Sequence, residues 1–241
     1  MFLDRSQAGR RLAERLASLR LVNPRVIVIS TGGVRIGWEI ASRLRAPMDV
    51  LIPQVVTVPG GLQIPLGVVT DGRFFPNGTA LLEHHVPRDY AERMAALEGQ
   101  VAGARERAYR REAPGLDVAG MTAIVVDDGS RGALAAYSTI EAIHRHGAEE
   151  VIYAAPFCTP GVSARIGHDA KLVTLYPPDE WRSVFITDES FQQTTDDEII
   201  SLIAQSRRFP ETPAWADREA RAGLLQPVAT PDGKALAACG G

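Results

Sequence analysis

The stretch VVDDGSRGA, residues 125–133, places two adjacent acids at the end of a hydrophobic, β-branched run and follows them with a loop of glycine and serine. In open α/β sheets, ligands bind beyond the carboxyl ends of the strands, where loops lead into helices whose first amides face outward. Asp127 and Asp128 can accept hydrogen bonds from two vicinal hydroxyls, directly or through Mg²⁺, while the amides after them can hold a phosphate. A ribose 5-phosphate presents both groups. The alternative is that the two acids only cap the next helix.

Strands and helices alternate on both sides of this stretch. The hydrophobic patterns predict strands at residues 26–29, 50–52, 124–126, 151–155 and 172–175, and helices at residues 6–20, 36–44, 133–146, 160–168 and 196–206. Such alternation implies a central parallel sheet with helices on both faces. Asp71-Gly72 lies between two apolar runs, which is the pattern of a two-residue β-hairpin turn. The sequence therefore predicts an α/β fold with a hairpin outside the parallel sheet.

A long helix is predicted after the hairpin. Its apolar positions form one stripe: Tyr90, Met94, Leu97, Val101, Ala104 and Ala108. Four arginines, Arg105, Arg107, Arg110 and Arg111, gather near its end, where cations suit the helix dipole. These arginines are interpreted as a solvent-exposed face of the helix, and the alternative is that they bind an anion.

Composition sets the broad class of protein. The 241 residues include 26 Lys and Arg against 29 Asp and Glu, a net charge of −3 that gives no general attraction to nucleic acid. No run of about 18 apolar residues is present, and charges interrupt the N-terminus, so we expect neither a membrane span nor a signal peptide and place the chain in the cytoplasm. Cys158 and Cys239 are expected to be free thiols. We expect one domain over residues 1–206 and a wrapping or partly disordered extension over residues 207–241.

The motifs, in the order in which they occur along the chain, resemble those of the type I phosphoribosyltransferases. The resemblance is greatest to the bacterial group whose acceptor is unknown. The resemblance covers roughly residues 1–205. The segments that carry it are Phe2-x-Asp4-Arg5, Ala8-Gly9, Gly32-Gly33, Pro59-Gly60 with Leu66-Gly67, the arginine-rich helix, Val126-Asp127-Asp128-Gly129 and Thr195-Asp196-Asp197-Glu198.

The resemblance implies a five-stranded parallel sheet with a small hood, and a glycosyltransferase of nucleotide metabolism. Such an enzyme uses phosphoribosyl pyrophosphate and Mg²⁺, and transfers the phosphoribosyl group to an acceptor, here an unidentified small molecule. Asp127 and Asp128 would be the catalytic pair that holds the ribose hydroxyls and Mg²⁺. The 5-phosphate would bind the amides of Gly129, Ser130, Arg131, Gly132, Ala133 and Leu134, and pyrophosphate would face Thr31, Gly32 and Gly33. Similar proteins are commonly homodimers.

Several positions depart from the family pattern. Thr31 stands where the group has an arginine, and Pro53-Gln54 stands where it has Arg-Lys, so two anion-binding cations are replaced. Arg131 stands where purine-salvage relatives place an acid, and a guanidinium cannot act as a base. Arg131 suits a phosphate or an anionic acceptor instead. The missing cations also keep an alternative open: a non-catalytic regulatory protein on the same fold that binds a ribose phosphate or nucleotide. An enzyme of other chemistry, such as a sugar-phosphate hydrolase, is a third hypothesis.

Overall fold

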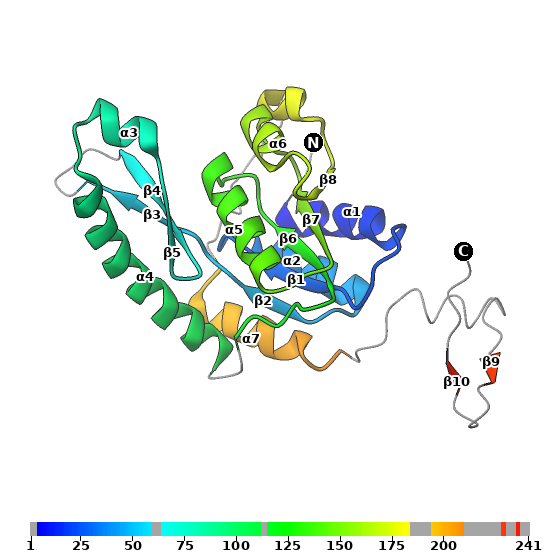
Figure 1. Ribbon diagram of the computed structural model, residues 1–241. Helices are drawn as coiled ribbons and strands as arrows, with labels where there is room; N and C mark the ends of the chain where they lie inside the picture. Colours follow the sequence, from blue (N-terminus) through cyan, green and yellow to red (C-terminus); the bar gives the residue numbers. More distant parts are fainter. Residues whose placement is uncertain are drawn as a thin grey trace.

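The structure is a computed structural model that describes residues 4–58, 64–111, 115–183 and 194–209, with two short strands beyond residue 209. Figure 1 shows a core built on one sheet and a smaller hood built on another. The core contains α1 (Arg5–Ala17), β1 (Arg25–Val28), α2 (Val34–Leu44), β2 (Met48–Val50), β6 (Thr122–Val126), α5 (Ala133–Arg145), β7 (Glu150–Ala155), α6 (Pro160–Ile166), β8 (Lys171–Thr174), the 3-10 helix η1 (Pro178–Ser183) and α7 (Asp196–Ser206). The hood contains β3 (Gln54–Thr57), β4 (Pro65–Thr70), β5 (Arg73–Pro76), α3 (Gly78–Glu83) and α4 (Arg88–Arg110).

The core sheet has five parallel strands in the order β2-β1-β6-β7-β8. Val26 of β1 pairs with Met48 of β2 on one side and with Ile124 of β6 on the other. The chain first places β2 on one side of β1 and later places β6, β7 and β8 on the other side. The strand order therefore reverses between β1 and β6. The carboxyl ends at such a reversal are where ligands bind in open α/β sheets. The parallel sheet, its helices and the hood confirm the predicted type I phosphoribosyltransferase-like fold class.

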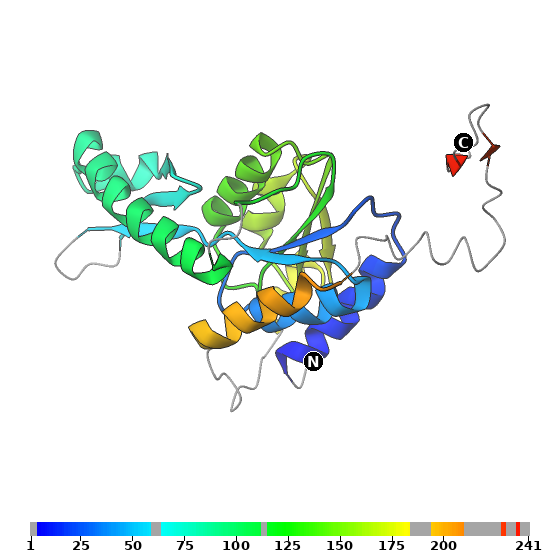
Figure 2. The ribbon, with the colours of Figure 1, turned by 90° about the horizontal axis from the view of Figure 1, so that it is seen from below.

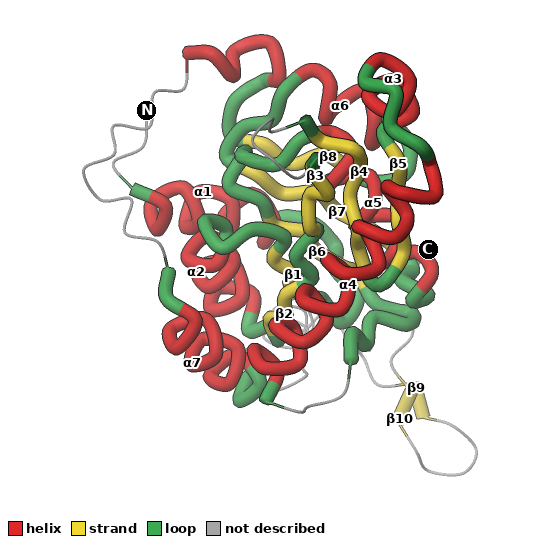
Figure 3. The backbone as a smooth tube through the Cα atoms, turned by 90° about the vertical axis from the view of Figure 1, so that its left-hand side faces the viewer, coloured by secondary structure: helices red, strands yellow, loops and turns green. Residues whose placement is uncertain are grey.

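Helices cover both faces of this sheet, as Figures 2 and 3 show. Val26, Ile124 and Ile152 pack in one apolar cluster with residues of α1, α2 and α7. Val125 and Tyr153 pack in the other cluster with residues of α5 and α6. Neighbouring residues of a strand point to opposite faces, and here both faces are buried, which explains the continuous apolar runs in the sequence.

The hood is an antiparallel sheet, β3-β4-β5, covered by α3 and α4. The predicted hairpin is present: Asp71 and Gly72 join β4 to β5 with φ angles of 52° and 70°, the two positive values that a type I′ turn needs. The strand β3 was not predicted, since the predicted strand in this region ends at residue 52, before Pro53. A strand can start directly after proline on the edge of a sheet, and β3 is such an edge strand.

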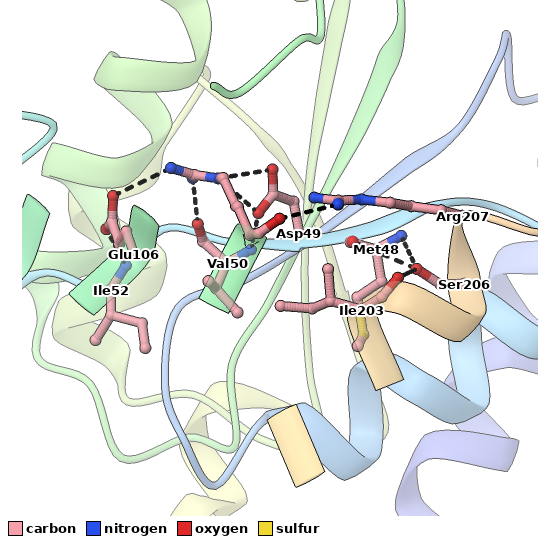
Figure 4. A network of polar contacts seen from close by, with 9 residues as sticks. Met48, Asp49, Val50, Ile52, Glu106, Ile203, Ser206 and Arg207 are labelled. Carbon is pink, nitrogen blue, oxygen red and sulfur yellow. Dashed lines mark hydrogen bonds and ion pairs between the residues drawn. The ribbon is translucent and has the colours of Figure 1, made fainter. Parts of the chain in front are cut away.

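A buried polar network joins the hood helix to the edge of the core sheet (Figure 4). Arg110 near the end of α4 donates from Nε to both carboxylate oxygens of Asp49, at 2.9 and 3.0 Å, and from Nη2 to the carbonyl oxygen of Val50 at 2.7 Å. Glu106, one turn earlier, accepts a hydrogen bond from the amide of Ile52 at 3.0 Å. Burial raises the pKa of Glu106 to about 7, although the Arg110 charge opposes the rise. Two residues of α4 thus hold the segment that leads from core to hood.

The hairpin turn of the hood rests on α5. The hydroxyls of Thr70 and Ser138 are both buried and lie 2.7 Å apart. Asp71 faces the Arg145 guanidinium at 3.5 Å and Nε2 of His146 at 3.0 Å. These contacts anchor the hood hairpin to α5, and the α4 network anchors the hood to the β2 edge of the core sheet.

Most of the predicted extension over residues 207–241 lies outside the described residues. Beyond residue 209 the structure describes β9 (Val228–Ala229) and β10 (Ala235–Leu236), which pair antiparallel. Cys158 is buried and free, as predicted, and Cys239 lies outside the described part of the chain. Within that part, no helix combines the length and hydropathy needed to cross a bilayer. The homodimer stays a prediction.

Candidate functional site

The loops that follow β1 and β6 meet at the reversal of strand order. Ser30 Oγ donates to Asp128 Oδ1 at 3.1 Å and accepts from the amide of Gly33 at 3.0 Å, so this one hydroxyl connects the two loops. The contact is close: a Cβ added to Gly32 would lie 1.9 Å from Asp128 Oδ2. The fold therefore brings the predicted Thr31-Gly32-Gly33 segment next to the segment that contains Asp127 and Asp128. Pro59-Gly60, which also carries the family resemblance, lies outside the described residues.

Asp128 has one oxygen firmly held and one held loosely. Besides the Ser30 hydroxyl, Oδ1 accepts from the amide and the hydroxyl of Ser130, at 3.2 and 2.6 Å. Oδ2 faces Arg5 Nη2 at 3.4 Å, and the Asp128 side chain is 11% exposed. Burial opposes ionisation, but the hydrogen bonds from Ser130, the contact with Asp127 and the Ser30 hydroxyl outweigh it and lower the pKa of Asp128. Asp128 is thus a charged carboxylate at neutral pH.

Asp127 points the other way, into the protein. Its side chain follows the alternation of β6 toward α5, and the residue is fully buried. Oδ2 accepts from the Tyr153 hydroxyl at 2.9 Å and from the Arg131 amide at 3.2 Å. Burial, followed by the charge of Asp128, raises the pKa of Asp127 to about 6. Asp127 therefore fixes the loop from inside, which leaves Asp128 as the carboxylate that a ligand can reach.

The loop after the two acids leads into a helix whose N-terminus has no side-chain cap. Gly132, which has no side chain, is the N-cap residue of α5, and among the residues that the structure describes no side chain bonds to the amides of the first turn, which begins at Ala133. Free amides at the start of a 13-residue helix attract an anion through hydrogen bonding and the helix dipole. Gly129 gives the loop its shape, because its φ is +88° and a Cβ there would lie 2.7 Å from the Phe157 ring. Phosphate binding by residues 129–134 stays a prediction.

The carboxylates also suit a divalent cation that a substrate helps to hold. Within the described ranges, no group of three or more His, Cys, Asp or Glu could bind a metal by itself. Mg²⁺ is commonly held by one or two carboxylates together with substrate phosphates and water. Asp128 Oδ2 is loosely engaged, so it fits as the protein's hard oxygen donor in such a shared Mg²⁺ site. Asp127 Oδ1 has no hydrogen-bond partner in the described part of the protein, but Asp127 is fully buried, so its role as a second Mg²⁺ ligand stays a prediction.

Three residues that shape this site were not assigned to it from the sequence. Arg5 and Ser30 contact Asp128, and Tyr153 bonds to Asp127. Arg5 belongs to a segment that carries the family resemblance, which was a signal for its importance but not for its position. Tyr153 has the pattern of an ordinary apolar residue of a strand. Their roles depend on which strands are neighbours, and the pattern along the chain does not give that.

Gly32→Ala is expected to lower the free energy of unfolding by about 1–3 kcal/mol, the usual cost of forcing an extra methyl group into a packed position. The added Cβ would displace the Asp128 carboxylate, since the two atoms cannot stand 1.9 Å apart. Chemical denaturation measures the change. Gly161→Ala is the matched control, because the nearest atom to its added Cβ lies 3.8 Å away. Equal stabilities for the two variants would contradict the close contact of the loops.

A parallel sheet whose strand order reverses, a hood attached to its β2 edge and an acid pair at the reversal are the features of a type I phosphoribosyltransferase-like fold. Comparison with known proteins agrees. The chain is 32% identical over 240 residues to two Mycobacterium tuberculosis proteins, "Putative phosphoribosyl transferase MT0597" of strain CDC 1551 / Oshkosh and "Putative phosphoribosyl transferase Rv0571c" of strain ATCC 25618 / H37Rv. These matches cover 96% of this chain and 54% of each relative, so the chain spans about half the length of the curated relatives it matches.

A solved structure covers the fold more fully. The protein TT1426 from Thermus thermophilus is 29% identical, and the match covers 85% of this chain and 98% of that one with a TM-score of 0.67. No protein-family model matches the chain. The predicted resemblance to the phosphoribosyltransferases is confirmed by the two Mycobacterium tuberculosis relatives.

Proposed function

We propose that the chain is a phosphoribosyltransferase that uses phosphoribosyl pyrophosphate and Mg²⁺ to ribosylate a small acceptor. The observation that carries the proposal is the charged Asp128 carboxylate between two glycine-containing loops, at the reversal of strand order. A carboxylate accepts hydrogen bonds from hydroxyl groups, and uncapped helix amides bind a phosphate. A phosphorylated pentose brings these two groups together in one ligand.

Each part of the substrate has a counterpart in the site. Asp128 Oδ2 would accept from the ribose hydroxyls, with Asp127 positioning the loop behind it. The amides of Gly129, Gly132, Ala133 and Leu134 would bind the 5-phosphate, whereas the amides of Ser130 and Arg131 already donate to Asp128 and Asp127. Thr31 and Gly32 would face pyrophosphate, whereas the amide of Gly33 already donates to Ser30. Mg²⁺, when bound, would neutralise part of the pyrophosphate charge beside the carboxylates.

The reaction would exchange one bond at the anomeric carbon of the ribose. The bond from that carbon to the pyrophosphate oxygen breaks, and the electron pair leaves with pyrophosphate. A lone pair of the acceptor forms the new bond, and the acceptor's proton passes to solvent. Because the transition state is cation-like, the protein would act mainly by stabilising the departing anion and by excluding water.

Arg131 points to the class of acceptor. Its side chain is half-buried at the end of the loop, just before α5, and its Nε is buried without a hydrogen-bond partner among the residues that the structure describes. A guanidinium binds carboxylate or phosphate oxygens in a planar fork and stays protonated. We therefore propose an anionic acceptor whose nucleophile needs no protein base at this position.

A second candidate function is binding without transfer. It is favoured by Thr31 and Gln54, which are uncharged at positions where the family pattern has a cation. The Gln54 side chain instead donates to the carbonyl oxygen of Ile52. Such a protein would bind phosphoribosyl pyrophosphate or a nucleotide as a regulator.

Calorimetry with phosphoribosyl pyrophosphate, with and without Mg²⁺, tests the proposal first, and ribose 5-phosphate serves as the control that lacks pyrophosphate. We expect Mg²⁺-dependent binding that is weaker for ribose 5-phosphate. A pyrophosphate-release assay across nucleobases, amines and small carboxylic acids then separates the two candidates. Turnover supports transfer, tight binding without turnover supports the regulator, and no binding rejects both.

A further inference from the structure

We propose that Arg5 is a substrate-binding residue, which exchanges its ion pair with Asp128 for an oxygen of the pyrophosphate group when the substrate enters. This inference rests on the proposed function and adds a residue to it. In the unliganded protein, Arg5 occupies the open oxygen of Asp128. Once it moves to pyrophosphate, that oxygen becomes available to the ribose hydroxyls.

Arg5 stands where the two site loops meet. It lies in the first turn of α1, and Nη2 is 3.4 Å from Asp128 Oδ2. The same nitrogen would lie 2.8 Å from a Cβ added to Gly32, so it rests directly against the loop that is proposed to face pyrophosphate. The Arg5 side chain is 17% exposed, which holds the guanidinium in place yet leaves it within reach of a ligand.

The ion pair is built so that it can be exchanged. A charge-assisted N–H···O bond normally measures about 2.7–2.9 Å, and this contact is longer, at 3.4 Å. The orientation of Asp128 does not depend on it, because Oδ1 accepts three hydrogen bonds from Ser30 and Ser130. Arg5 can therefore leave while the carboxylate stays in position.

The charge balance of the site requires a cation here. Pyrophosphate would bring several negative charges next to Asp127 and Asp128, and like charges at this range repel strongly away from bulk water. Thr31 and Gln54 contribute no charge, and Arg131 lies on the far loop, at the start of α5. Arg5 is a cation already in contact with both loops, so it can compensate the pyrophosphate charge as the substrate binds.

The test uses the full chain and four variants: Arg5→Ala, Arg5→Lys, Asp128→Asn and Arg10→Ala. Arg10 is the matched control, because it lies on the same helix and pairs on the surface with Glu39 at 3.2 Å. Calorimetry measures the affinity of each protein for inorganic pyrophosphate without metal, and for phosphoribosyl pyrophosphate with Mg²⁺. Thermal denaturation shows whether each variant is folded.

We expect Arg5→Ala to weaken both affinities by roughly tenfold or more, the usual effect of losing a charged hydrogen bond, with partial recovery in Arg5→Lys. Arg10→Ala should bind like the wild type. Asp128→Asn releases Arg5, so it should bind metal-free pyrophosphate at least as tightly as the wild type. If the ion pair only supports the fold, Arg5→Ala and Asp128→Asn would lose pyrophosphate binding together, and that result overturns the inference.

Two other outcomes are distinguishable. A wild type that binds phosphoribosyl pyrophosphate with Mg²⁺, while Arg5→Ala binds it equally well, overturns the role of Arg5 and leaves the proposed function standing. A wild type that binds phosphoribosyl pyrophosphate with Mg²⁺ but does not bind metal-free pyrophosphate also overturns the role of Arg5 and leaves the proposed function standing. A wild type that binds neither ligand rejects the proposed function, and the inference with it.

Discussion

Asp128→Asn is expected to weaken the binding of phosphoribosyl pyrophosphate with Mg²⁺ by about 100-fold or more, since it converts two charged hydrogen bonds, each contributing about 1.5–3 kcal/mol, into neutral ones. The substitution also removes the negative charge that would face Mg²⁺. Transfer should fall at least as far as binding does. Calorimetry and the pyrophosphate-release assay measure the two quantities.

The fold should tolerate this substitution. The asparagine oxygen can still accept the hydrogen bonds from Ser30 and Ser130, so the loops keep their connection. Asp179→Asn, at an exposed position in η1, is the matched control and should leave binding unchanged. Binding of the Mg²⁺ complex that is as tight in Asp128→Asn as in the wild type would refute the central role given to this carboxylate. Asp128→Asn should thus bind phosphoribosyl pyrophosphate with Mg²⁺ more weakly than the wild type, but metal-free pyrophosphate at least as tightly. General damage to the site would weaken the binding of both ligands, so it cannot produce these two results together.

The core of the fold could be predicted from the sequence because its local signals agree with one another. The final helix was predicted at residues 196–206 and begins and ends there, since Thr195 caps it and three acids occupy its first turn. The parallel strands were predicted to within about two residues, because runs that are buried on both faces stand out against polar loops.

The long hood helix shows where periodicity fails. Its apolar stripe was interpreted as one face, yet Leu97 and Val101 are 57% and 65% exposed. The face that packs on the hood sheet contains Ala91 and Ala95, and the buried end of the helix contains Arg110. The buried face of this helix carries small alanines, and its buried arginine is paired with Asp49, so neither appears as a strongly apolar position in the sequence. The hydrophobic pattern alone could therefore not distinguish the buried face of the helix from its exposed face.

The location of the candidate site could be predicted from the sequence, but the different roles of Asp127 and Asp128 could not. Asp127 and Asp128 are adjacent, so they point to opposite sides of the strand end, and only one of them can reach the ligand. The sequence could not say which, because both sides of the sheet are covered by helices. The contact between Arg5 and Asp128 joins residues 123 positions apart, and it follows from packing α1 beside the reversal of strand order.

Asp127→Asn is expected to make the folded protein more stable at pH 8, by about 1–2 kcal/mol. The pKa of Asp127 is about 6 in the folded protein, against an ordinary value of 3.8. Between these values the folded state binds more protons than the unfolded state, so this group's contribution to stability is complete below pH 3.8 and is lost as the pH rises through 6. Two pKa units correspond to about 3 kcal/mol. Asparagine avoids this loss, but it introduces a buried amide N–H₂ beside Asp128, which offsets part of the gain.

Urea denaturation at pH 4.5, 6 and 8 measures the effect, and the advantage of Asp127→Asn should grow with pH. Asp89→Asn is the control: the pKa of that exposed carboxyl is lowered, chiefly by its hydrogen bond with Arg93, so its variant should show no such growth. A stability difference that does not change with pH would mean that Asp127 is not an ionised carboxylate held in a buried position. If the difference does grow, the wild type keeps a charge that works against its own folding. Residues that weaken a fold in this way are retained where function requires them, so the same variant should bind phosphoribosyl pyrophosphate with Mg²⁺ less tightly than the wild type, although the loss should be smaller than in Asp128→Asn.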